Sequence, residues 1–144
     1  MDIARWFRPD DRYEGVRPIH IWLLRVLFAL VVLFVLPDSW GAILRHQGDW
    51  DPLRAAAVCM WAGYSLLSVI GVFHPLRMVP IVLFEIVYKS IWLAVVAYPL
   101  WAADRLAGSP AESLTEAFLW LPLPLLAMPW GYAWRHYVLG RKPV

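Results

Sequence analysis

The chain has 144 residues, of which 61% are hydrophobic and only 17% are charged, and its formal net charge is +2. Soluble domains average about half apolar and about a quarter charged residues, so this composition argues strongly against a soluble domain. The small net charge, with no basic stripe, argues against nucleic acid as a partner. A single cysteine, Cys59, excludes an intramolecular disulfide.

Four long apolar runs predict an all-α, polytopic integral membrane protein that is a four-transmembrane-helix bundle. Spans of roughly 20 residues suffice to cross a bilayer, which leaves no room for a second domain. The first run ends at Pro37-Asp38-Ser39, since proline and polar residues end a helix. We expect an interfacial segment over 1–18, a single transmembrane domain over 19–139 with spans at about 19–37, 55–73, 76–101 and 114–139, and a tail over 140–144.

The fourth run contains Pro122, Pro124 and Pro129. Each proline removes a backbone donor, so these residues form a candidate kink or gate. A discontinuous helix at a substrate site has this pattern, and so does an ordinary kinked span. We favour the kink because membrane helices tolerate proline.

Basic residues in the flanking segments predict the orientation. One side carries eight of them and the other carries three, and cytoplasmic loops are enriched in Lys and Arg. Both termini should therefore be cytoplasmic, with the lipid bilayer as the main partner. The eight are Arg5, Arg8, Arg12, Arg17, Arg77, Arg135, Arg141 and Lys142, and the three are Arg45, Arg54 and Arg105.

Three charged residues lie deep inside predicted spans, where ionisable groups are costly and often functional. Glu85 and Lys89 are four residues apart in the favourable order, so they can pair on one helix face. At 1.5 Å per residue, Glu85 lies about 12 Å beyond Arg77, and Arg25 lies about 10 Å beyond Pro18 on the same side. We expect a buried cluster in which Glu85 sits between Lys89 and Arg25.

Such a cluster carries one excess positive charge, which nearby hydroxyl groups could offset. The candidate polar lining consists of Tyr64, Ser65, Ser68 and Ser90. For Tyr64 and Ser68 we favour hydroxyl groups that bond across helices or back to their own backbone over groups that line a pathway, because the former is commoner in membrane helices.

Small residues in the second span fall at multiples of four and predict a helix-packing stripe, because small side chains let another helix approach closely. These residues are Ala55, Cys59, Gly63 and Gly71.

His20, His74 and His136 all map to the cytoplasmic side and could in principle ligate haem or a divalent metal. None has metal-ligand spacing to another His, Cys or acidic residue. We therefore expect no metal and no cofactor, and we identify no catalytic residue.

Two adjoining stretches, His74-Pro75-Leu76-Arg77-Met78-Val79-Pro80 and the run from Leu83 to Leu93, resemble a segment of small bacterial four-span membrane proteins. The resemblance covers only the third span and its entry. It implies a four-helix protein of the bacterial inner membrane, and it implies no substrate because that group has no established activity.

Three functions remain open. We favour a non-enzymatic accessory or helix-packing subunit of a membrane complex, or a small homo-oligomer. The alternative is a transporter or channel component that uses Glu85 as a protonatable site. The third is an enzyme or carrier that handles a lipid, a quinone or haem.

Overall fold

The computed structural model describes residues 6–140, which form helices joined by turns. Within this part of the chain there is no β-strand, and one isolated β-bridge joins Asp10 to Val16. The helices are, in chain order, η2 (Asp11–Tyr13), α1 (Pro18–Leu30), η3 (Val31–Val35), α2 (Leu36–Arg45), α3 (Pro52–Phe73), η4 (Pro75–Met78), α4 (Val79–Trp92), η5 (Leu93–Ala97), α5 (Tyr98–Ala102), α6 (Glu112–Phe118), α7 (Pro122–Ala127), α8 (Trp130–Ala133) and η6 (Trp134–Val138).

Among residues 6–140, three continuous helices are long and apolar enough to cross a membrane. They are Pro18–Arg45 with 28 residues, Pro52–Phe73 with 22 and Pro75–Ala102 with 28. The second and third agree closely with the predicted spans at 55–73 and 76–101. Hydropathy predicts these two well because charged or proline-containing segments bound each apolar run.

The first long helix continues past the point where the sequence predicts its end. Pro37 lies inside the helix, which runs on through α2 to Arg45. The π-helical turn η3 precedes Pro37, and its last hydrogen bond joins the Leu36 N–H to the Val31 carbonyl, five residues back. A proline normally clashes with the carbonyl four residues earlier, and a wider turn at this point accommodates the ring.

The third long helix also has a π-helical turn before a proline, since η5 ends two residues before Pro99. Its closing bond joins the Tyr98 N–H to the Leu93 carbonyl. A π-turn before a proline thus lets two long helices pass a residue that commonly ends a helix in water.

The fourth apolar run is interrupted rather than kinked, so the favoured prediction of an ordinary kinked span over 114–139 is wrong, and the discontinuous alternative describes the run better. It forms α6, α7, α8 and η6, each of seven residues or fewer. The first break precedes α7, which has Pro122 at its start. The second falls at Met128, whose backbone is extended (ψ 121°) because the residue before a proline avoids the helical region.

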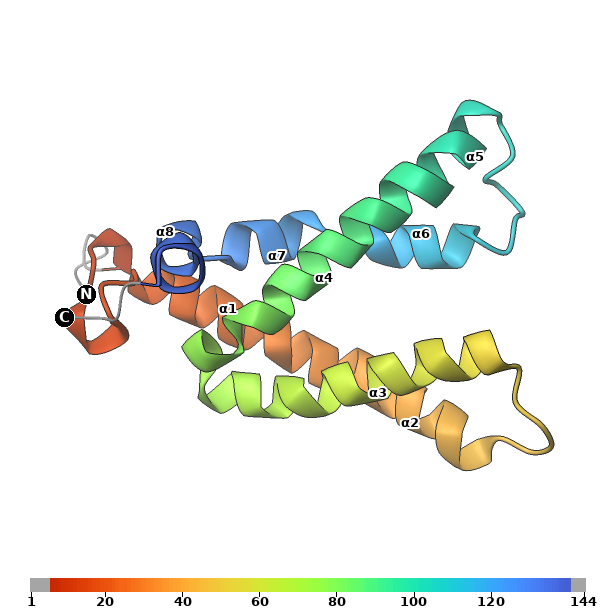
Figure 1. Ribbon diagram of the computed structural model, residues 1–144, viewed down its shortest axis with the longest axis horizontal. Coiled ribbons are helices and arrows are strands. Elements are labelled where there is room, and N and C mark those ends of the chain that lie inside the picture. The colour runs from red at the N-terminus through yellow and green to blue at the C-terminus, as the bar shows by residue number, and fades with distance from the viewer. Residues whose placement is uncertain (1–5, 141–144) are drawn as a thin grey trace.

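Figure 1 shows how these helices are arranged. The first long helix (α1, η3 and α2) runs beside α3, and α7 lies against α1. The turn η4, the helix α8 and residues 11–17 lie together at what we call the closed end. The connections 46–51 and 103–111 lie at the other end, the open end, where α2 and α3 diverge from α5 and α6.

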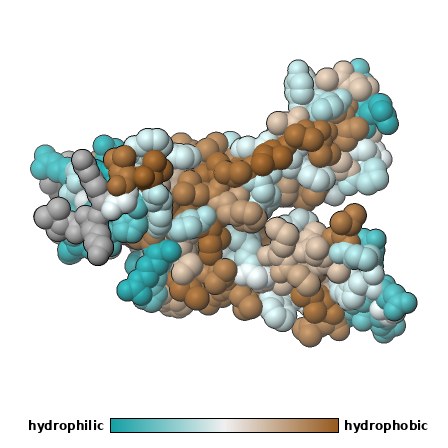
Figure 2. All heavy atoms as spheres, viewed as in Figure 1, coloured by the Kyte–Doolittle hydropathy of each residue, from teal (hydrophilic) through white to brown (hydrophobic). Residues whose placement is uncertain are grey.

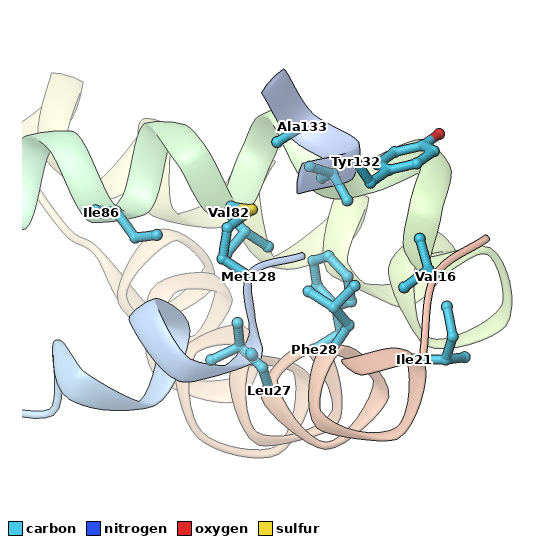
Figure 3. Close-up of a cluster of buried hydrophobic side chains, with 12 residues drawn as sticks. Val16, Ile21, Leu27, Phe28, Val82, Ile86, Met128, Tyr132 and Ala133 are labelled. Atoms are coloured by element: carbon cyan, nitrogen blue, oxygen red, sulfur yellow. The ribbon is translucent and has the colours of Figure 1, made fainter. Parts of the chain in front are cut away.

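The buried core lies at the closed end (Figure 3). Leu24 and Phe28 of α1, Val79 and Val82 of α4, and Met128 between α7 and α8 have no exposed surface. Gly71 of α3 is needed here, because a Cβ atom at this position would lie 2.6 Å from the Phe28 ring. Close approach of α1 and α3 therefore depends on a glycine.

Apolar side chains also cover much of the outer surface, and Figure 2 shows them as brown patches along the helices. Phe34 is 70% exposed, and Leu33 and Leu126 are similarly open. Contiguous apolar surface on this scale is unusual for a soluble monomer. It suits a protein that is surrounded by lipid.

Candidate functional site

Three polar side chains from two helices form a hydrogen-bonded network, which we call the Glu85 network. Tyr64 of α3 donates its hydroxyl hydrogen to Oε2 of Glu85 over 2.7 Å. Lys89, one turn after Glu85 on α4, donates from Nζ to Oε1 over 2.6 Å. The sequence spacing therefore predicted the Glu85–Lys89 pair correctly.

Glu85 is only 2% exposed, so its charge must be compensated inside the protein. Lys89 supplies the opposite charge, and each carboxylate oxygen accepts one hydrogen bond. A buried ion pair is tolerated when its geometry is good and its remaining polar atoms are satisfied. The network also joins α3 to α4. Apart from it, these two helices are connected mainly by η4, which contacts both of them.

Arg25 is not part of this network, and its predicted pairing with Glu85 is not formed. Within residues 6–140 it makes no hydrogen bond or ion pair, and its Nε atom is buried without a partner. Its helix, α1, packs mainly against α3 and α7. The sequence predicts how far along its helix Arg25 lies. That position does not determine the direction in which the side chain points.

The three serines of the candidate polar lining bond to their own helices, which for Ser68 is the interpretation we favoured. Ser65 donates to the Ala62 carbonyl, Ser68 to the Tyr64 carbonyl and Ser90 to the Ile86 carbonyl. Their hydroxyl groups are therefore occupied. Of the four candidates, only Tyr64 bonds to Glu85.

The predicted helix-packing stripe differs from the face of α3 that packs inside the monomer. Gly71 is buried, Ala55 is half-buried, and Cys59 and Gly63 are exposed. The buried face is displaced around the helix and consists of Val58, Ala62, Ser65, Ser68 and Gly71. A pattern of small residues shows where close approach is allowed, whereas the partner helices determine which face is used.

An open cleft of about 750 Å³ borders the Glu85 network, between the first long helix, α3, α4 and the α6–α7 region. Figure 2 shows the molecule hollowed between its two arms at the open end. The wall is mostly apolar, with six aromatic side chains and three charged ones. It is formed by Leu27, Leu30, Val31, Phe34, Val35, Asp38, Trp61, Tyr64, Glu85, Tyr88, Lys89, Leu114, Ala117, Phe118, Trp120, Leu123 and Pro124.

The cleft is the feature that sequence reasoning missed. Its wall combines residues from Leu27 to Pro124, and no local pattern brings these segments together. One local signal of the cleft was available in the sequence, because Tyr88 is an aromatic residue directly before Lys89. Its ring packs edge-on against Phe118 at 5.5 Å between centroids, and Lys89 Nζ lies 5.7 Å from the centre of the same Phe118 ring.

One of the three prolines of the fourth run lines the cleft. Pro124 belongs to its wall, and Pro122 begins the same short helix, α7. Pro129 lies at the second break and is the N-cap residue of α8. The interruption therefore shapes one wall of the cleft.

The histidines are not gathered into a metal site. No cluster of three or more His, Cys, Asp or Glu side chains suited to a metal occurs among residues 6–140. His20 Nδ1 lies 3.3 Å from the Ala127 carbonyl oxygen, and His136 stacks on Tyr132 at 5.2 Å between centroids.

Comparison of the chain with protein-family models, with curated proteins and with solved structures finds no match.

Proposed function

We propose that this chain is a non-enzymatic integral protein of the bacterial inner membrane, and that it serves as an accessory or helix-packing subunit of a membrane complex or forms a small homo-oligomer. It would cross the membrane four times with both termini in the cytoplasm. Three long apolar helices support the first three crossings. The fourth would be the interrupted segment from α6 to η6, which returns from the open end to the closed end.

The Glu85 network is the observation that carries this proposal. Both oxygens of Glu85 are bonded, Lys89 balances its charge, and the network joins α3 to α4. A group that transports a proton must change its charge during the cycle. A carboxylate held by two partners across two helices is better suited to fixing which helices are neighbours.

Replacement of Glu85 tests this role. In Glu85→Gln, one ion pair is lost and the Lys89 charge is left uncompensated, so we expect the free energy of unfolding to fall by about 3 kcal/mol. Adding Lys89→Met should restore part of that loss because it removes the uncompensated cation. Thermal denaturation in detergent, followed by circular dichroism, measures both variants. Full stability of Glu85→Gln alone would contradict a structural role.

The orientation can be tested by labelling single cysteines. In a Cys59→Ser background, we expect an impermeant thiol reagent to label cysteines introduced at Gly48 and Gly108 in intact cells. Cysteines introduced at Arg8 and Lys142 should react only after the membrane is permeabilised. Labelling at Arg8 from outside would overturn the orientation.

Transport is the second candidate, because Glu85 and Lys89 border the cleft. Its wall is mainly apolar, which disfavours a continuous path for water. Proton flux in reconstituted vesicles that disappears in Glu85→Gln, with an unchanged melting temperature, would favour transport over the structural role.

A further inference from the structure

We propose that the cleft binds a membrane-soluble quinone, a flat ring with carbonyl groups and an apolar tail, and that the ring lies beside Tyr88 and Lys89. This inference goes beyond the proposed structural role, and it concerns binding only. It depends on the size, polarity and aromatic content of the cleft.

The size of the cleft suits a small molecule. Its volume of about 750 Å³ falls within the roughly 300–1,000 Å³ range of ligand pockets.

The polar groups at the base of the cleft favour a neutral ligand with hydrogen-bond acceptors. Lys89 Nζ carries three hydrogens, and among the described residues its one hydrogen bond is to Glu85. Tyr88 forms no hydrogen bond within the same part of the chain, so its hydroxyl group is also available. Lys89 is neutralised by Glu85, and Asp38 adds a negative charge to the wall. These charges disfavour an anionic lipid or a fatty-acid carboxylate.

The position of these donors further narrows the class of ligand. Lys89 lies about 18 Å beyond Arg77 along the helix, close to the middle of a bilayer core about 30 Å thick. Phospholipid headgroups and ester carbonyls lie at the surface of that core, and acyl chains carry no acceptor. A quinone carries its carbonyl groups on an apolar ring that can enter the core.

Aromatic side chains supply flat surfaces for a ring. Phe34, Trp61, Tyr88, Phe118 and Trp120 belong to the wall, and Trp120 and Phe34 are each at least 70% exposed. Aromatic rings attract one another in offset or edge-on arrangements at 4.5–7 Å. The described wall offers no His, Cys or Met side chain as an axial ligand for haem.

Binding can be measured with a benzoquinone that carries a ten-carbon tail, added to the full-length protein in phosphatidylcholine nanodiscs. We expect saturable binding and a higher melting temperature for the wild type. The matched probe is a ten-carbon alcohol, which has the tail without the ring and should not compete. Equal competition by the alcohol, or the absence of saturable binding, would overturn the proposal.

Two variants locate the site. Ala117→Phe places a ring in the cleft and should weaken quinone binding at least tenfold, whereas Ala94→Phe, at an exposed position outside the cleft wall, should leave it within about twofold. Tyr88→Phe keeps the ring but removes the hydroxyl donor, and should weaken binding about 2- to 10-fold at an unchanged melting temperature. Wild-type affinity in either Ala117→Phe or Tyr88→Phe would overturn the assignment.

Discussion

Both ends of the helical assembly carry large apolar side chains, but they are packed in different ways. At the closed end, side chains of α1, α4 and the α7–α8 break interlock so tightly that Phe28, Val82 and Met128 have no exposed surface. At the open end, Phe34 and Trp120 are at least 70% exposed and border a cleft. Hydrophobic content therefore does not show where a membrane bundle is held together. Lipid tails are as apolar as hydrophobic side chains, so close packing between helices, rather than hydrophobicity, determines where the helices are held together.

The comparison predicts that stability is concentrated at the closed end. Residues there should be sensitive to changes in volume, since packed interiors have little free space. Residues at the open end face the cleft or the surroundings and should tolerate substitution. The Glu85 network lies between the two regions.

We expect the largest effect from Phe28→Ala, which leaves a cavity in the closed-end core and should lower the free energy of unfolding by about 3–5 kcal/mol. Phe34→Ala is the matched control at the open end and should cost less than about 1 kcal/mol, because this ring is 70% exposed. Denaturation in mixed micelles measures both. Equal losses would remove the distinction between the ends.

The next effect is expected at the boundary between the ends. Tyr64→Phe removes the donor to Oε2 of a buried carboxylate and should cost about 1–3 kcal/mol. Tyr88→Phe is the control, since within the described chain its hydroxyl makes no hydrogen bond, and it should leave the melting temperature unchanged. If both tyrosines behaved alike, the network would not stabilise the contact between α3 and α4.

Two glycines of α3 provide a similar contrast within one helix. Gly71→Ala pushes a methyl group against the buried Phe28 ring and should cost about 1–3 kcal/mol. Gly63→Ala meets no atom within 4 Å and should stabilise the protein by up to about 1 kcal/mol through helix propensity. Melting temperatures should therefore move in opposite directions, and a shift of the same sign in both variants would contradict the packing of α1 on α3.

The smallest effect is expected at Pro37. The helix already continues past this residue through η3, so Pro37→Ala should change the free energy of unfolding by less than about 1 kcal/mol. Helix content from circular dichroism should stay constant. A large gain in helix content would show that the π-turn does not accommodate the proline.

The sequence predicts some features of this fold well because they depend on local properties. Hydropathy located the second and third long helices, and the four-residue spacing of Glu85 and Lys89 predicted their pairing. The end predicted before Pro37 was wrong, since proline stops a helix only when no wider turn accommodates its ring.

Features that depend on how helices rotate against one another were not predictable from this sequence. Arg25 has the expected depth but does not reach Glu85, because α1 packs on α3 and α7. The cleft likewise joins side chains as distant in sequence as Phe34 and Phe118. One sequence supplies the position of each residue along its helix but not the angle of that helix about its own axis.

Helix length has a consequence of its own. At 1.5 Å per residue, the two 28-residue helices measure about 42 Å, and the 22-residue α3 measures about 33 Å. A hydrocarbon core about 30 Å thick matches α3 when it is nearly upright, whereas the longer helices must tilt or extend into the headgroup region. A thinner bilayer would increase that tilt in helices that also form the two arms. We therefore expect the width of the opening to change with membrane thickness, so that access to the cleft would depend on the lipid composition of the surrounding bilayer.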